Sequence, residues 1–384
     1  MTAESVYPAC SLHPSPIHSA TQFTFSHPLY SYQYTAEPEK NEPRFKSFDA
    51  FLQDNGYSIG DLALKQSYRP VEIQRGCMNK LPVGITIKHQ KYRHVDHIEF
   101  MNVEEMKNFA NYWIDTLEMA EQRAGWLYGY YIEDSHYPLG IRAVCEAIYE
   151  PPQRSFMEYS ELLSDPFLNT VDRIANKLGL ERIGYIFTHL PRENVMTPKD
   201  IIDAAKRQLD TAKDIHYTGY PVSTHVTCTM CPDGEGKPVL NAFMASDSAM
   251  ALLRDGMFSE EQNDIKMVEI RKASSSFEIL PQIFESGKEV SSFDSDWLIV
   301  RVNDSAPIHP MPFFKHTGFP RENREVSTDV NIWKYTNTPC DFHLLLYIAN
   351  TLDVDTALAV CDSILKGEEV DGLIWDLLGG MQNE

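Results

Sequence analysis

Gly184-Tyr185-Ile186-Phe187-Thr188-His189 and, shortly after it, Thr197-Pro198-Lys199-Asp200 indicate a strand followed by a helix. The first segment belongs to an apolar and aromatic run that follows Arg182 and is typical of a buried strand. The second combines a threonine cap, a proline at the first helical position and an acid three residues after the cap. We therefore predict a strand over 182–188 and a helix that begins at Thr197.

Strand and helix patterns continue on both sides of this pair. Asn102 is the predicted N-cap of a helix over 102–120, and Asp165 that of a helix over 166–178. We expect further helices over 249–254 and 341–378, and strands over 124–131, 141–149, 224–230, 239–244 and 297–302. This order predicts an α/β (α+β) protein, with a mixed sheet flanked by helices and a C-terminal α+β extension.

The composition argues against several classes of function. The 384 residues carry 34 basic and 55 acidic side chains, which gives a formal net charge of −21. Such a chain is a poor match for nucleic acid or for an anionic membrane surface, since both require neutralisation of phosphates. No apolar run is long enough to span a bilayer, and no secretory signal is visible. Seven cysteines without a framework spacing predict reduced thiols in the cytosol or nucleus.

The segment from 184 to 200 resembles the JAMM signature of MPN-domain metalloproteases. In that signature a glycine-aromatic strand runs into His-x-His, and a serine and an aspartate follow at fixed spacing. His189 falls on the second histidine, Asp200 falls on the aspartate, and Thr197 replaces the serine. The resemblance implies an MPN/JAMM-like fold for this part of the chain.

Two positions of the signature lack the required chemistry. Phe187 stands at the first histidine, and a phenyl ring cannot coordinate zinc. Gln122 stands where the general-base glutamate is expected, and a neutral amide cannot take a proton from water. Helix capping alone also explains Thr197 and Asp200. We therefore predict no catalytic residue, no bound metal and no other cofactor, and we regard these five residues as a degenerate metal site.

One cysteine and three histidines lie close together earlier in the chain and resemble part of a zinc finger: Cys77, His89, His94 and His97. Structural zinc needs four ligands, and only one cysteine is present. We therefore interpret the histidines as surface residues of a polar segment.

Four longer blocks are more specific, and in chain order they are Gly125-Trp126-Leu127-Tyr128-Gly129, Ile148-Tyr149-Glu150-Pro151-Pro152-Gln153, Phe319-Pro320-Arg321-Glu322-Asn323-Arg324 and Asp341-Phe342-His343-Leu344-Leu345-Leu346. Together they resemble the nuclear protein localization protein 4 family. The match covers roughly residues 46 to 365, and chance is a poor explanation for blocks of this length in this order.

The resemblance implies a non-enzymatic adaptor in the cytoplasm and nucleus, with association with the ER membrane through its partners. Members of the family pair with ubiquitin fusion degradation protein 1 and bring polyubiquitylated proteins to the valosin-containing AAA ATPase. A groove across the MPN and C-terminal regions is understood to hold an unfolded ubiquitin. Ubiquitin, polyubiquitin chains and these two proteins are therefore the expected partners, without nucleic acid and without direct membrane insertion.

The resemblance also divides the chain into four parts. We expect a disordered tail over 1–45, a degenerate zinc-finger-like segment over 46–99, a catalytically inactive MPN domain over 100–256 and a C-terminal domain over 257–384. The tail cannot supply the ubiquitin-like domain with which family members commonly begin, and the zinc-finger segment retains only Cys77.

Twelve residues of the family blocks are candidates for partner binding: Tyr149, Glu150, Pro151, Pro152, Phe319, Arg321, Glu322, Asn323, Arg324, Asp341, Phe342 and His343. Arg324 in particular is expected to take part in a buried Arg–Asp pair or to contact a partner. Two other functions stay open. One is a residual zinc-dependent ubiquitin isopeptidase that uses His189 and Asp200, and the other is a structural MPN subunit of a different complex.

Overall fold

The computed structural model describes residues 24–25, 45–73, 80–212, 216–324 and 331–381. Most of the predicted tail over 1–45 lies outside these residues, as does Cys77. Within the tail, Thr24–Phe25 form strand β1, which runs parallel to β13 (Pro238–Ala245).

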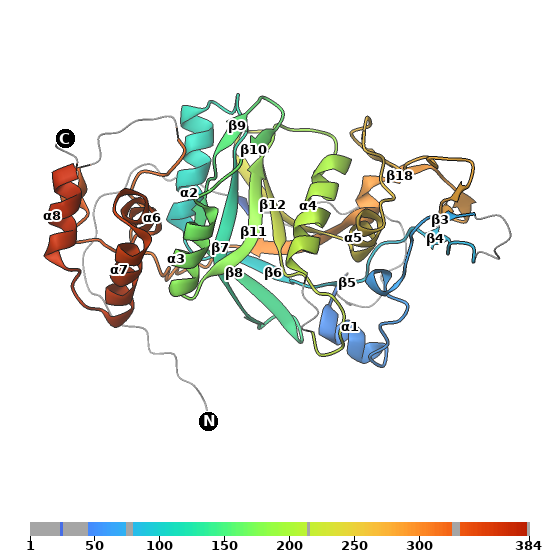
Figure 1. Ribbon diagram of the computed structural model, residues 1–384, viewed down its shortest axis with the longest axis horizontal. Coiled ribbons are helices and arrows are strands. Elements are labelled where there is room, and N and C mark those ends of the chain that lie inside the picture. Colours follow the sequence, from blue (N-terminus) through green and yellow to red (C-terminus); the bar gives the residue numbers. More distant parts are fainter. Residues whose placement is uncertain (1–23, 26–44, 74–79, 213–215, 325–330, 382–384) are drawn as a thin grey trace.

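The centre of the molecule is an eight-stranded mixed sheet (Figure 1). Its order is β1, β13, β12 (Val226–Pro232), β11 (Glu181–Thr188), β7 (Ala124–Asp134), β8 (Gly140–Tyr149), β6 (His97–Phe100) and β19 (Ile299–Ser305). Because β19 also pairs with β13, the seven strands from β13 to β19 close on themselves. The enclosed side holds one apolar core, which α2 (Val103–Asn111) joins through Met106 and Phe109.

Helices cover the sheet on two sides and extend the molecule at one end (Figure 1). α3 (Leu168–Lys177) packs with the C-terminal helices α6 (Phe342–Thr351), α7 (Val354–Lys366) and α8 (Gly372–Met381), and α4 (Pro198–Thr211) packs with α5 (Asp247–Arg254) and α1 (Phe48–Asp54). A π-helical turn, Tyr112–Thr116, follows α2. Among the described helices, none has both the length and the hydropathy that crossing a bilayer requires.

Small sheets join the segment before the main sheet to the segment after α5. β3 (Val71–Glu72) pairs with β15 (Glu278–Ile279), and β4 (Ile85–Thr86) pairs with β16 (Ile283–Glu285). The other short elements are β2 (Lys46–Ser47), β5 (Tyr92–Arg93), β9 (Gln153–Ser155), β10 (Ser160–Leu162), β14 (Met267–Glu269), β17 (Lys288–Glu289), β18 (Ser292–Asp294) and 3-10 turns at Ala63–Lys65, Ser295–Leu298 and Ile332–Lys334.

The predicted fold class is confirmed, since the described chain is α+β with a mixed sheet flanked by helices. The strand and helix predicted within 182–200 are present as β11 and α4, and Thr197 caps α4 with a complete capping box. Asn102 also caps α2 as predicted, because its side chain accepts a hydrogen bond from the Glu105 N–H. The region 341–378 is helical as predicted and forms the three helices α6, α7 and α8.

Two local predictions were wrong. Asp165 is not the N-cap of α3, because the helix begins at Leu168 after Phe167. Instead, Asp165 accepts hydrogen bonds from the Phe167 N–H and the Tyr149 hydroxyl. Trp297 lies in a 3-10 turn, and the predicted strand begins two residues later at Ile299.

The main sheet also contains strands from outside the range 100–256. β6 starts at His97, and β19 lies within the segment 257–384. Inward-facing residues alternate with partly exposed ones along β19, and Val300 and Val302 enter the enclosed core. The pairing of β19 with both β6 and β13 therefore places this late strand in the same sheet as β7 and β8, which carry the first two family blocks.

Candidate functional site

The degenerate metal positions lie where β7, β11 and the β9–β10 hairpin meet. Gln122 is buried, and its side-chain oxygen accepts a hydrogen bond of 2.8 Å from the Thr188 hydroxyl. Its side-chain nitrogen donates to the Met157 carbonyl at 2.8 Å. The amide at the predicted base position is therefore engaged at both ends and holds the hairpin against the end of β11.

Phe187 and His189 stand next to each other at the end of β11, with ring centroids 6.0 Å apart. The Nδ1 atom of His189 lies 2.8 Å from the Leu190 carbonyl and donates to it. Burial lowers the pKa of His189 to about 4, so the ring is neutral near pH 7. Its Nε2 atom is buried and has no hydrogen-bond partner among the described residues.

Thr197 and Asp200 serve the N-terminus of α4. The Asp200 carboxylate accepts from the Thr197 N–H at 2.9 Å and from Arg192 at 2.5 Å. An aspartate that is committed to a cap and to an arginine differs from an aspartate that is open to a metal ion. Within the described part of the chain, no three His, Cys, Asp or Glu side chains gather in a way that could hold a metal ion.

The three histidines of the earlier segment lie in separate environments. His94 is buried and its Nε2 atom lies 2.9 Å from Asp247, whereas His97 faces Ser305 at 2.6 Å. The exposed His89 lies against Trp297, with the two rings tilted and their centroids 4.3 Å apart. The prediction of surface histidines is therefore wrong for His94, because its apolar neighbours in the core and the buried Asp247 carboxylate hold it inside.

The twelve candidate partner-binding residues come together where the main sheet meets the C-terminal helices. They belong to the end of β8, to the segment 319–324 and to the start of α6. Asp341 caps α6 through the N–H groups of His343 and Leu344, and its second oxygen accepts from the Phe319 N–H at 3.0 Å. Phe342 is buried and packs on Tyr128 of β7.

Glu150 is the centre of a buried ion cluster at this junction. Arg123 donates to one oxygen of the Glu150 carboxylate at 2.8 Å, and Arg324 donates to the other oxygen. Asn323 donates to the Glu150 carbonyl at 2.9 Å. Burial alone would raise the pKa of Glu150, but Arg324 and Arg123 outweigh it and hold the pKa below its usual value. Arg324 does form an ion pair, but its acid is Glu150, the residue after the end of β8, and not the aspartate that was expected.

A second ion cluster lies beside the first. Both ring nitrogens of His343 face carboxylates, with Nε2 at 2.8 Å from Glu105 and Nδ1 at 2.9 Å from Glu322. Arg321 forms an ion pair with the other oxygen of Glu105. Burial would lower the pKa of His343, but Glu322 and Glu105 outweigh it and raise the pKa to about 9. The ring is therefore an imidazolium that donates in both directions.

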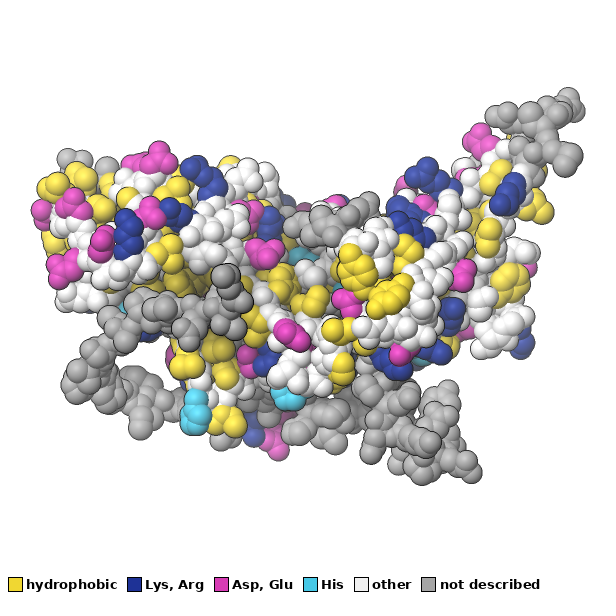
Figure 2. All heavy atoms as spheres, turned by 90° about the horizontal axis from the view of Figure 1, so that it is seen from below, with side chains coloured by type: hydrophobic (Ala, Val, Ile, Leu, Met, Phe, Trp, Pro, Cys, Tyr) yellow, Lys and Arg dark blue, Asp and Glu magenta, His cyan; other side chains and the backbone are white. Residues whose placement is uncertain are grey.

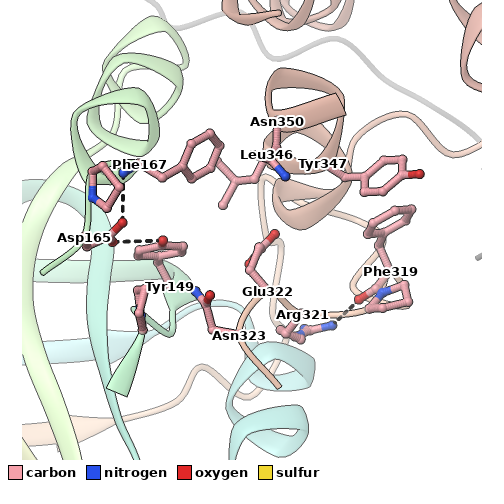
Figure 3. A pocket seen from close by; sticks show the side chains of 13 residues that line it. Tyr149, Asp165, Phe167, Phe319, Arg321, Glu322, Asn323, Leu346, Tyr347 and Asn350 are labelled. Carbon is pink, nitrogen blue, oxygen red and sulfur yellow. Dashed lines mark hydrogen bonds between the residues drawn. The ribbon is translucent and has the colours of Figure 1, made fainter. Parts of the chain in front are cut away.

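A pocket of about 420 Å³ opens between these clusters, α3 and α6 (Figure 3). Its walls include four aromatic rings, from Tyr149, Phe167, Phe319 and Tyr347. Six candidate residues line it: Tyr149, Pro152, Phe319, Arg321, Glu322 and Asn323. The other six candidates do not line it: Glu150, Pro151, Arg324, Asp341, Phe342 and His343.

The candidates predicted from the sequence leave out several residues of this junction: Glu105, Arg123, Asp165, Phe167, Leu346, Tyr347 and Asn350. The helix pattern places Glu105 in the first turn of a helix, and Glu105 does lie there. Its ion pairs with Arg321 and His343 do not follow from that pattern. An acid at the boundary of the apolar face of a helix is a weak signal for a buried ion pair, and it is the signal that could have identified Glu105.

Comparison with known proteins places these observations in a family. The model of the NPL4 family matches residues 123–377, and the model of the NPL4 family, putative zinc binding region, matches residues 30–116. Within the second range, the described histidines do not converge on a shared point, so the described residues do not fit a zinc site.

Curated relatives agree with the family models. The chain is 30% identical over 315 residues to the nuclear protein localization protein 4 homolog of Drosophila melanogaster. The aligned residues cover 71% of this chain and 48% of the relative. The human homolog is 31% identical over 315 residues (71% and 51%), and the Debaryomyces hansenii protein is 30% identical over 378 residues (88% and 65%). The chain thus spans about half to two thirds of the length of these relatives, and it belongs to the NPL4 family.

Proposed function

We propose that the chain is a non-enzymatic adaptor with a catalytically inactive MPN domain. With ubiquitin fusion degradation protein 1, it binds polyubiquitylated proteins and delivers them to the valosin-containing AAA ATPase for unfolding and proteasomal degradation, including ER-associated degradation. The observation that carries this proposal is that residues of three family blocks gather around one pocket at the junction. We place this activity in the cytoplasm and nucleus.

The chemistry of the degenerate positions supports the absence of catalysis. Zinc-dependent hydrolysis of an isopeptide bond requires a metal-bound water and a base that removes a proton from that water. Gln122 cannot serve as that base, and its amide is fixed to Thr188 and Met157. Asp200 is bound to Arg192.

The junction supports the capture of an unfolded ubiquitin segment. An extended polypeptide is held best by a surface that offers apolar or aromatic side chains together with polar groups for its backbone. The pocket has four aromatic walls, and Asn323 and Asn350 supply amides at its edge. The acidic field of the chain does not oppose ubiquitin as it would oppose a nucleic acid.

A binding experiment tests the role of the pocket. Asn350 is exposed and lines the pocket, so Asn350→Trp fills the mouth without disturbing the core. We expect this variant to bind tetra-ubiquitin chains at least about tenfold more weakly in biolayer interferometry, a loss of about 1.4 kcal/mol. The matched control is Asn263→Trp, at an exposed asparagine that does not line the pocket. Equal affinities of both variants would contradict the proposed binding surface.

Two further assays separate this proposal from the alternatives. Co-purification with the AAA ATPase and ubiquitin fusion degradation protein 1 is expected for the adaptor, and a structural subunit of another complex would not give it. Incubation of the chain with ubiquitin chains is expected to release no ubiquitin. Cleavage that stops when a zinc chelator is added would establish the residual isopeptidase instead.

A further inference from the structure

One oxygen of Glu322 in the pocket has no partner among the described residues. The Oε2 atom of Glu322 accepts from His343 at 2.9 Å, whereas Oε1 is buried and makes no hydrogen bond to any of them. A buried acceptor without a partner costs about 1–3 kcal/mol, so most such atoms in folded proteins are satisfied. This atom can therefore accept one more hydrogen bond, and a donor from outside the described chain reaches it when the carboxylate turns toward the pocket.

The surroundings of Glu322 restrict what that donor can be. In Figure 3 the Glu322 carboxylate extends toward the middle of the pocket, between Tyr149 and the side chains of α6. The aromatic rings around the carboxylate favour a ligand side chain with an aliphatic stem, and the faces of the rings attract a cation. A carboxylate among the aromatic walls of a pocket is complementary to a positive group on a long apolar stem.

The charges of the pocket also favour a cation. Among the described residues that line it, Arg321 is the only basic one, and its guanidinium is engaged by Glu105 and by the carbonyls of Thr317 and Phe319. The two acids Glu105 and Glu322 are balanced by Arg321 and the imidazolium of His343. Asp165 remains, and no basic side chain in the described part of the chain forms an ion pair with it.

We propose that this pocket receives a lysine side chain of the bound polypeptide, whose ammonium group donates to the Oε1 atom of Glu322. This inference rests on the proposed function, because it specifies which side chain of an extended segment enters the pocket. The lysine stem lies between the rings of Tyr149, Phe167 and Tyr347.

The number of available acceptors favours lysine over arginine. A guanidinium group gains most from a carboxylate that offers both oxygens to its planar fork. His343 occupies one oxygen of Glu322, so the fork loses its second acceptor. An ammonium group is a point charge and can use a single carboxylate oxygen, together with the remaining lone pairs of the Tyr149 hydroxyl.

Fluorescence anisotropy with short labelled peptides tests the proposal. The probes are unstructured 12-residue peptides of Ser, Val and Gly that differ only at a central residue, which is lysine, arginine, norleucine or Nε-acetyl-lysine. We expect the lysine peptide to bind about tenfold more tightly than the norleucine and acetyl-lysine peptides, with arginine between them. Glu322→Gln is expected to bring the lysine peptide to the level of norleucine and to leave the norleucine peptide unchanged. Glu369→Gln removes an exposed acid that does not line the pocket and is the matched control.

The acetyl-lysine peptide changes only the ligand, so the test holds even where Glu322→Gln does not fold. Equal affinity of the lysine and norleucine peptides would overturn this inference and leave the proposed adaptor role intact. Binding of tetra-ubiquitin without binding of any peptide would overturn the inference as well. Loss of both tetra-ubiquitin and peptide binding would overturn the proposed function together with it.

Discussion

His343 gives a prediction about how stability depends on pH. Its imidazolium lies between Glu105 and Glu322, and Arg321 also faces Glu105. Because the folded state binds the His343 proton more tightly than the unfolded chain does, this interaction stabilises the fold fully below the unfolded pKa. The stabilisation is lost as pH rises through the folded pKa.

The size of the effect follows from the two pKa values. Raising the pKa of His343 from 6.5 to about 9 corresponds to a stabilisation of about 3 kcal/mol at pH 6. We therefore expect the free energy of unfolding to fall by about 3 kcal/mol between pH 6.5 and 9. Burial raises the pKa of Glu146 to about 7, so most of its effect on stability is complete before the upper half of this window.

Urea unfolding at a series of pH values, followed by tryptophan fluorescence, measures this fall. In the variant His343→Gln the group that titrates is removed, so the variant is expected to be less stable at pH 6.5 and to lose less stability on the way to pH 9. Equal slopes for the variant and the original chain between pH 7 and 9 would refute the assignment of the proton to His343. His309→Gln, at an exposed histidine outside the junction, is the control.

Three other substitutions have expected outcomes in the same assay. Glu150→Gln leaves the buried Arg123 and the partly buried Arg324 without their counter-ion and is expected to cost about 3–5 kcal/mol, more than Arg324→Ala, which leaves one arginine on the carboxylate. A methyl group added by Gly129→Ala would overlap the Val144 carbonyl oxygen of the paired strand, so this variant is expected to give no folded protein, whereas Gly234→Ala points into open space and is expected to fold. Thr197→Ala removes the cap of α4 and is expected to cost about 1 kcal/mol, and an unchanged urea midpoint would contradict that role.

The local elements could be predicted because their signals are local. The strand β11 and the start of α4 are encoded by contiguous residues, and the capping box needs only the short stretch from Thr197 to Asp200. Asp165 shows where such reasoning fails. Its carboxylate could cap a helix by sequence, but the Tyr149 hydroxyl from β8 competes for it, and the helix starts later.

The candidate site could be predicted only as a set of residues and not as an arrangement. The family blocks named most of the residues at the junction, yet the partners of Arg321 and Arg324 lie 216 and 174 positions away in the chain. No periodicity or spacing connects residues at such separations. The pocket itself also depends on Phe167 and Tyr347, which in sequence are ordinary aromatic residues of a helix start and a helix face.

The junction suggests why buried acids recur on this side of the sheet. Glu105, Glu146 and Glu150 come from α2 and the end of β8, and each holds a different point of the segment 313–324, through Arg321, the Phe313 N–H and Arg324. Apolar contacts alone would allow this segment to slide, because they are not directional, whereas an ion pair or hydrogen bond at each point fixes one register. The same fixed register sets the position of Glu322 on the pocket wall. These ion pairs and the hydrogen bond offset part of the cost of burying the three carboxylates, and they also keep the acidic group of the pocket in one position.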